Sequence, residues 1–314
     1  MTGNILVIGG AHMDRRGRIG GATAMGASNP GRWIEEPGGG GLNAARNLSR
    51  LGYSVRLIAP RGGDSAGEQI ADAARNAGID DCPIVFLDRA TPSYTAILES
   101  GGNLIVALAD MDLYHVFTPR RLRARSLRSS LDIARLVLCD ANLPEETLTA
   151  LAEEAALRHL PISAIAISPA KVVRLRPSLR HLDCLFMNTA EAQALTGERP
   201  VHPEGWPALL RRTGLMAGVV TSGGGTVVAF DQASVATLSP PRLEPVVDVT
   251  GAGDAFAAGF IASRLDSANL GEALRHGAAV AALTLLSPHA TAEILSRDLL
   301  KLNLALVPDA KILS

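Results

Sequence analysis

Short apolar segments alternate with segments of helical periodicity along most of this chain, and this alternation limits the folds open to it. Residues 4–10 and 54–59 look like strands, and helical patterns follow them at 42–51 and 65–77. Later strands are predicted at 136–139, 162–167, 182–187 and 217–221, and helices at 145–158, 189–196, 205–213, 254–265 and 270–286. Right-handed crossovers between such units build one mostly parallel sheet with helices on both faces.

Composition agrees with buried strands and excludes several partners. The 314 residues are 47% hydrophobic but only 4% aromatic, so aliphatic side chains carry the core. A formal charge of −1 gives no field that would recruit nucleic acid or an anionic membrane, and no run nears the ~20 apolar residues of a membrane span. Because Cys82, Cys139 and Cys184 lack metal-binding spacing, we expect buried thiols in a cytoplasmic protein. The arginines between Arg120 and Arg128 form either a solvated helix face or a binding patch.

Two segments interrupt the alternation. Residues 11–37 are rich in glycine and polar side chains and lack a helical period, whereas 91–117 includes strand-like runs at 94–99 and 103–109. Together with a strand at 84–88, these runs suggest a meander or hairpin. We expect a small β-sheet lid, built from 11–37 and 91–117, on a single domain spanning 1–314. Exposed edges of such a sheet commonly need a partner, so we expect a homodimer that forms through the lid. The mass of the protein in solution tests whether it is a dimer.

Polar residues follow many of the predicted strands. In an open parallel sheet, ligands gather at the carboxyl ends of the strands. The polar positions that follow predicted strands are Asp14, Asn142, Ser168, Asn188, Thr221 and the turn 248–254. We expect them to meet in one cleft.

The stretch Asp248-Val-Thr-Gly-Ala-Gly-Asp-Ala-Phe256 offers an anion site beside an acid. Gly251 and Gly253 let backbone N–H groups approach a phosphate, and a helix that begins near Asp254 adds the positive end of its dipole. A carboxylate there would repel the same phosphate unless it has a proton to accept, which indicates a general base. The alternative is an Asp N-cap after a glycine turn.

The commoner nucleotide motifs do not fit. No lysine stands in a G-x-x-x-x-G-K-[ST] loop. Gly39-x-Gly41-x-x-Ala44 matches the dinucleotide fingerprint only in form, because Glu35-Glu-Pro37 precedes it instead of a strand. Two glycine turns that each open a helix remain, and they suit phosphoryl transfer between two ligands. Asn188 and Glu191, three residues apart at a helix start, either orient a hydrated Mg²⁺ or cap the helix.

These motifs resemble, in order along nearly the whole chain, those of the ribokinase-like (PfkB) carbohydrate and nucleoside kinases. The stretches that carry the resemblance are Asp14, Gly38–Asn43, Asn188-x-x-Glu191, Thr221-x-Gly223 and Asp248–Asp254. The resemblance implies a ribokinase-like three-layer α/β sandwich with a mostly parallel central sheet and a small β-sheet lid. It also implies ATP and Mg²⁺, with a monovalent cation near Asp248 in some relatives.

The resemblance also implies a role for each matching residue. Asp254 would be the catalytic base, beside an anion hole formed by Gly251, Ala252 and Gly253. The substrate side would comprise Asp14, Gly39, Gly40, Asn43, Asn142 and Lys171. The nucleotide side would comprise Asn188, Glu191, Thr221, Gly223 and Gly225, with Glu191 holding Mg²⁺ through water.

Within the family the resemblance is strongest to the pseudouridine kinases. It rests on Gly26–Gly31, Ala107–Asp112, Cys139–Glu145 and Ser168–Lys171. It implies transfer of a phosphoryl group from ATP to the 5′-hydroxyl of pseudouridine. The alternatives are a kinase for another nucleoside or a free sugar such as ribose or fructose, and a ligand-sensing protein that kept the fold.

Base recognition would come from the lid. Ser28, Asn29 and Asp110 offer donors and acceptors to a uracil-like base, although Ser28 and Asn29 are also turn formers. Two positions depart from the family pattern on the substrate side. Leu42 stands where an arginine is expected before Asn43, and Ile165-Ala166 replaces an acid-proline pair.

Overall fold

A ten-stranded sheet forms the centre of the computed structural model, which describes residues 4–313. Residues 1–3 and 314 of the predicted domain 1–314 lie outside the described residues. The parallel strands are β6 (Asp80–Asp81), β4 (Val55–Ile58), β1 (Asn4–Ile8), β10 (Ala134–Asp140), β11 (Ile162–Ile165), β12 (Cys184–Asn188) and β13 (Gly218–Thr221), in that spatial order. Three antiparallel strands continue the sheet beyond β13: β14 (Val227–Phe230), β15 (Val235–Leu238) and β16 (Lys311–Leu313).

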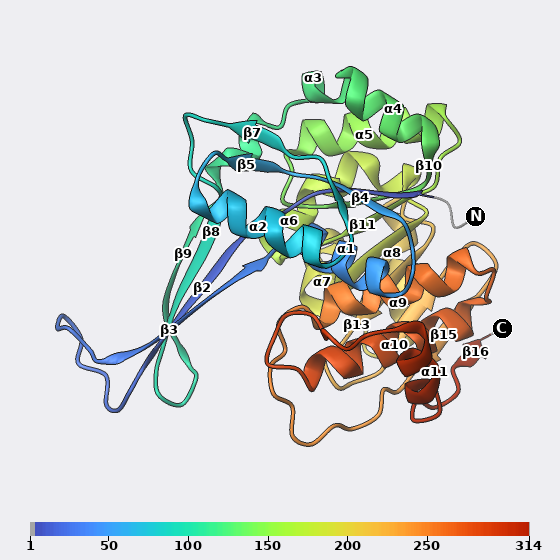
Figure 1. Cartoon of the computed structure of the whole chain (residues 1–314). Coiled ribbons are helices and arrows are strands. Elements are labelled where there is room, and N and C mark those ends of the chain that lie inside the picture. The colour runs from blue at the N-terminus through green and yellow to red at the C-terminus, as the bar shows by residue number, and fades with distance from the viewer. Residues whose placement is uncertain (1–3, 314) are drawn as a thin grey trace.

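Helices cover both faces of this sheet because its strands are apolar on both faces. In β1, Ile5 and Val7 belong to one buried cluster, whereas Leu6 and Ile8 belong to the other. The first cluster is covered by α1 (Gly40–Arg50), α2 (Ser65–Asn76), α9 (Ala252–Leu265), α10 (Leu270–Leu285) and α11 (Arg297–Leu304). The second is covered by α3 (Pro119–Leu122), α4 (Arg125–Ile133), α5 (Glu145–Leu157), α6 (Pro169–Val172), α7 (Thr189–Thr196) and α8 (Trp206–Arg212), with 3₁₀ turns η1 (Asp112–Val116), η2 (Val173–His181) and η3 (Pro203–Gly205) on the same side or beside it. The predicted three-layer α/β sandwich is confirmed (Figure 1).

A second, four-stranded sheet extends away from the body (Figure 1). Its strands, in spatial order, are β3 (Gly31–Gly38), β2 (His12–Ile19), β8 (Ser93–Leu98) and β9 (Leu104–Asp110). They come from the two segments that interrupt the alternation. The strand predicted at 84–88 does not join this sheet. Instead β7 (Ile84–Phe86) pairs with β5 (Pro60–Gly62) in a separate two-stranded sheet.

The five arginines from Arg120 to Arg128 are exposed on and around α3 and α4, as expected of a solvated face. Cys139 and Cys184 are buried as predicted, but Cys82 is only half-buried. Between residues 4 and 313, no helix is both long and apolar enough to cross a membrane.

Asp140, at the end of β10, connects the loops at the C-terminal ends of the central strands. Its side chain is fully buried and accepts three backbone hydrogen bonds. Oδ2 accepts from the N–H of Gly10, at 2.7 Å, and from that of Gly41, at 2.8 Å, while Oδ1 accepts from the N–H of Asn142, at 2.9 Å. One carboxylate thus joins the loops after β1 and β10 to the first turn of α1.

Replacing Asp140 with Asn should destabilise the protein without changing side-chain size. Whichever way the new amide turns, its NH₂ group faces at least one backbone N–H, and each N–H left unsatisfied costs about 1–3 kcal/mol. We expect Asp140→Asn to lower the free energy of unfolding in urea by about 2 kcal/mol or more. Asp132→Asn, at an exposed ion pair with Arg158, is the matched control and should change it by less than about 0.5 kcal/mol. Equal stabilities for both variants would contradict this account.

Candidate active site

The turn before α9 is shaped by a glycine that no other residue can replace without strain. Gly251 is the N-cap of α9 and has φ 75°. A Cβ on Gly251 would also overlap the carbonyl oxygen of Ala290. The helix begins at Ala252, earlier than predicted, and no side chain caps it. The alternative interpretation of Asp254 as an N-cap is therefore wrong.

The two glycine turns face each other across Asp254. Asn43, in α1, donates from Nδ2 to Oδ2 of Asp254, at 3.0 Å. A Cβ on Gly40 would lie 3.4 Å from Oδ1 of Asp254 and 3.3 Å from Oδ2 of Asp140, so the first turn of α1 approaches both acids closely. A Cβ on Gly253 would meet nothing within 4 Å, so the start of α9 is open to a ligand.

The surroundings of Asp254 favour its protonated form. Although the residue is only half-buried by exposed area, its carboxyl group has lost most of its hydration, and this burial raises its pKa. The hydrogen bond from Asn43 lowers the pKa, whereas the charges of Asp140, Asp14 and Glu191 raise it further. The resulting pKa of Asp254 is about 7, which suits a group that accepts a proton near neutrality.

Lys171 and Asn142 stand together beyond the ends of β10 and β11. The Lys171 Nζ donates to Oδ1 of Asn142, at 2.6 Å, and the backbone N–H of Asn142 bonds to Asp140. Burial lowers the pKa of Lys171, against the opposing effect of the Asp140 charge. The Nδ2 of Asn142 is buried and has no hydrogen-bond partner within residues 4–313. This amide is therefore a donor that a ligand can satisfy.

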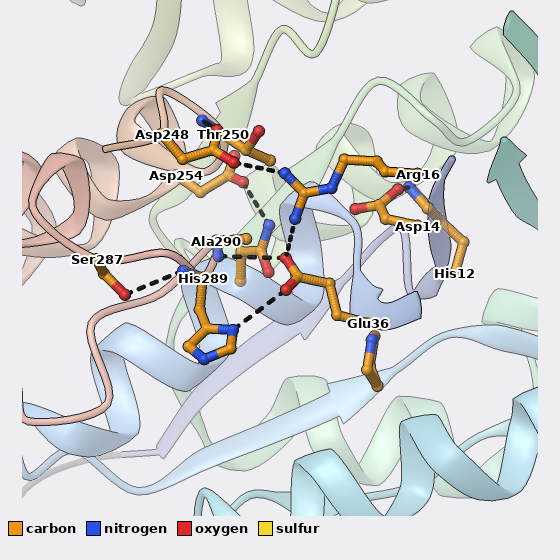
Figure 2. Close-up of polar contacts among 12 residues, drawn as sticks. His12, Asp14, Arg16, Glu36, Asp248, Thr250, Asp254, Ser287, His289 and Ala290 are labelled. Atoms are coloured by element: carbon orange, nitrogen blue, oxygen red, sulfur yellow. Dashed lines mark hydrogen bonds and ion pairs between the residues drawn. The ribbon is translucent and has the colours of Figure 1, made fainter. Parts of the chain in front are cut away.

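Asp14 belongs to β2 and is held by a residue that the sequence analysis missed. His12 Nε2 lies 3.3 Å from Oδ1 of Asp14 (Figure 2). His12 Nδ1 lies 3.0 Å from the hydroxyl of Tyr114. Residues two apart in a strand share a face, so period-two spacing around Asp14 was the signal that could have found His12. Asp110, on β9, is in register with Met13 on β2 through Ser93 on β8, the strand between them. Two strand spacings place Asp110 about 10 Å from Met13.

Ser28 and Asn29 are not brought to Asp254. Both lie in the exposed loop beyond the outer end of β2 and β3, about 17 Å along the strand from Asp14. The Asn29 amide accepts from the N–H of Ala24 and donates to the carbonyls of Ala24 and Ala27. Asn29 thus acts as a turn former in this structure.

The residues predicted for the nucleotide lie at neighbouring strand ends. Asn188 ends β12 and pairs in register with Thr221 at the end of β13. Asn188 and Glu191 form a reciprocal capping box on α7, with bonds of 2.7 and 3.0 Å. Gly223 and Gly225 lie in the exposed turn that follows β13.

Glu191 offers limited support for a metal ion. It is 6% exposed, and burial raises its pKa although the bonds to Asn188 lower it. One of its oxygens, Oε2, already accepts the Asn188 N–H. The described part of the chain contains no cluster of three metal-binding side chains. A Mg²⁺ ion here would therefore be held mainly by water and phosphate oxygens, which Mg²⁺ tolerates well.

A family model matches almost the whole chain. The model described as "pfkB family carbohydrate kinase" aligns with residues 2–297. The chain belongs to this family. As a pfkB family member it is a sugar or nucleoside kinase, and the converging glycine turns, Asp254 and Asn43 form its candidate active site.

Comparisons with individual proteins also identify kinases. The chain is 30% identical to pseudouridine kinase of Escherichia coli (strain K12), over 86% of this chain and 87% of that protein. It is 58% identical to the solved structure of a carbohydrate kinase from Agrobacterium tumefaciens, with a TM-score of 0.90 and coverage of 99% and 100%. Arabidopsis thaliana ribokinase complexed with ribose and ATP shares the fold at 22% identity, with a TM-score of 0.85 and coverage of 97% and 99%.

The raised pKa of Asp254 predicts how stability depends on pH. The folded protein holds this proton up to about pH 7, whereas an unfolded Asp loses it near pH 4. The folded state therefore loses stability relative to the unfolded state as pH rises through this window, by up to about 4 kcal/mol. Asp254→Asn lacks this loss, so in urea unfolding its stability relative to the wild type should rise as the pH increases from 5 to 8, a range that covers most of this window.

Asp72→Asn is the control, because Asp72 is exposed on α2 in an ion pair with Arg75. Its stability relative to the wild type should stay nearly constant over the same pH range. A constant difference for Asp254→Asn as well would show that Asp254 titrates like an ordinary carboxylate.

Proposed function

We propose that the protein transfers the γ-phosphoryl group of ATP to the 5′-hydroxyl of a nucleoside, with pseudouridine as the first choice. The observation that carries this proposal is the Asp254 carboxylate, with a pKa of about 7, beside the open N-terminus of α9. It places a proton acceptor next to a site that favours phosphate.

Each group at the site has a task in such a reaction. Asp254 takes the proton of the substrate hydroxyl while the oxygen of that hydroxyl forms a bond to the γ-phosphorus. The bond from the γ-phosphorus to the bridging oxygen of ADP breaks. The backbone N–H groups of Gly251 and Gly253 stabilise the charge on the phosphoryl oxygens. The N–H of Ala252, which the family resemblance adds to this set, already donates to the carbonyl oxygen of Val249 at 3.3 Å. Asn43 holds the carboxylate in place, and Gly40 lets the first turn of α1 approach it closely.

The nucleotide would lie beyond β12 and β13. The neighbouring positions of Asn188 and Thr221, together with the exposed turn at Gly223 and Gly225, support this assignment. The ATP in the structure of the Arabidopsis ribokinase supports the choice of phosphate donor. Mg²⁺, oriented by Glu191 through water, would neutralise charge on the transferring phosphoryl group.

The four-stranded sheet would act as the lid over the substrate. It carries Asp14 and Asp110 at the end nearest the body. Asp14, held by His12, would bind the ribose hydroxyls. Lys171 and Asn142 would contact the substrate from the body of the fold. Closure of the sheet would exclude water, which would otherwise divert ATP to hydrolysis.

Pseudouridine is supported by the relative at 30% identity and by the resemblance of the stretches Cys139–Glu145 and Ser168–Lys171 to pseudouridine kinases. A free-sugar kinase is the second candidate. Asn29 bonds within its own loop instead of facing the site, and a small sugar needs no contact from that loop. The ribose in the Arabidopsis ribokinase structure agrees with this alternative. A ligand-sensing protein would be expected to lack the base, and Asp254 is present.

Purified wild type and Asp254→Asn should be compared with pseudouridine, uridine, adenosine, ribose and fructose as acceptors, following both ADP and phosphorylated product. We expect a preference for pseudouridine in the wild type and a fall in kcat of about 10²–10⁴-fold in the variant. Asp72→Asn should keep wild-type rates. Equal rates for wild type and Asp254→Asn would remove Asp254 as the base. A preference for ribose or fructose would favour the sugar kinase, and ATP binding without turnover would favour the sensor.

A further inference from the structure

Arg16 connects the four-stranded sheet to the turn that precedes α9. It lies on β2, two residues after Asp14, and its side chain is only 20% exposed. Its Nη1 lies 2.5 Å from Oδ2 of Asp248, and its Nη2 lies 3.2 Å from Oε1 of Glu36 on β3 (Figure 2). One guanidinium group therefore bridges two carboxylates that come from different parts of the fold.

Asp248 has both of its oxygens engaged. Oδ1 accepts the backbone N–H of Thr250, at 2.8 Å, while Oδ2 accepts from Arg16. Burial raises the pKa of Asp248, but the bonds from Thr250 and Arg16 outweigh it and lower the pKa below its ordinary value. Thr250 directly precedes Gly251, so the ion pair fixes the residue that leads into the candidate anion hole.

Glu36 contacts the segment 289–290, which packs against the same turn. Its Oε1 accepts the backbone N–H of Ala290, and its Oε2 faces Nδ1 of His289, both at 3.3 Å (Figure 2). Gly251 packs against Ala290 so closely that a Cβ would overlap its carbonyl oxygen. Arg16 and Glu36 thus hold together the turn 248–251 and the segment 289–290 that supports it.

This arrangement does not fit a monovalent cation bound by Asp248, which the family resemblance implies for some relatives. A cation bound by Asp248 would have to lie against a carboxylate oxygen. The Asp248 carboxylate already faces a guanidinium group and an N–H, and a second positive charge beside Arg16 would be repelled.

We propose that Arg16 is a positioning residue that takes the place of this cation, so that a charge carried by the small sheet fixes the turn 248–253 for phosphoryl transfer. The inference about turnover rests on the proposed kinase function. The inference about the fixed charge does not, because the ion pair should govern the response of the folded protein to salts whether or not a substrate is known.

The test compares K⁺ with tetramethylammonium at equal ionic strength. For the wild type we expect kcat to agree within about twofold in the two salts, and the Tm of the protein without substrates to be the same in both. Arg16→Ala should lose about tenfold or more of kcat in tetramethylammonium, the loss expected on removing a charge-assisted hydrogen bond. K⁺ should restore part of that kcat and raise the Tm of this variant.

Arg15→Ala is the matched control. Arg15 is the neighbour of Arg16 on β2, points to the opposite face and pairs with Glu35 at 3.5 Å. Its kcat and its Tm should not respond to K⁺. A wild type whose kcat falls about tenfold or more without K⁺, or whose Tm rises in K⁺, would overturn the proposal even if Arg16→Ala fails to fold. An Arg16→Ala variant with wild-type kcat in both salts would overturn it as well. If no acceptor is phosphorylated, the kinase function fails, and the Tm comparison still decides the role of Arg16.

Discussion

The three hydrogen bonds accepted by the buried Asp140 carboxylate fix the geometry on which the site depends. They hold the loop after β1, the loop after β10 and the first turn of α1 in one place. Since α1 carries Asn43, the same carboxylate indirectly determines where the Asp254 side chain is held. Its charge also helps to raise the pKa of Asp254. A single buried acid thus contributes to both the shape and the electrostatics of the site.

Much of the fold follows from local sequence patterns. Apolar runs buried on both faces predict the parallel strands, and α7 was predicted with its observed bounds, Thr189–Thr196. β2 was not predicted because its sequence, His12–Ile19, is mostly polar and depends on pairing with β3 and β8. The strand at 84–88 was assigned to the wrong sheet, since strand pairing between distant segments leaves no mark in a local pattern.

The site was predictable where backbone geometry demands glycine and not where side chains meet across the fold. Gly251 has a positive φ, and Gly40 approaches its neighbours too closely for a side chain. Glycine at these two positions was therefore a signal that the sequence itself contains. Whether an acid caps its own helix or faces another segment is decided by tertiary contacts. Glu191 caps α7, whereas Asp254 bonds to Asn43. Asp248, the partner of Arg16 that lies 232 residues away along the chain, could not be read from spacing.

The central claim is that Asp254 acts as a base whose pKa has been raised by its surroundings, and the pH dependence of kcat/KM for the acceptor tests it most directly. The measurement is made at saturating ATP, so that ionisation of the free nucleotide does not enter. The account predicts that kcat/KM falls as pH is lowered, with an apparent pKa of about 7. A kcat/KM that stays constant from about pH 8 down to about pH 5, as for a carboxylate with an ordinary pKa near 4, would contradict it.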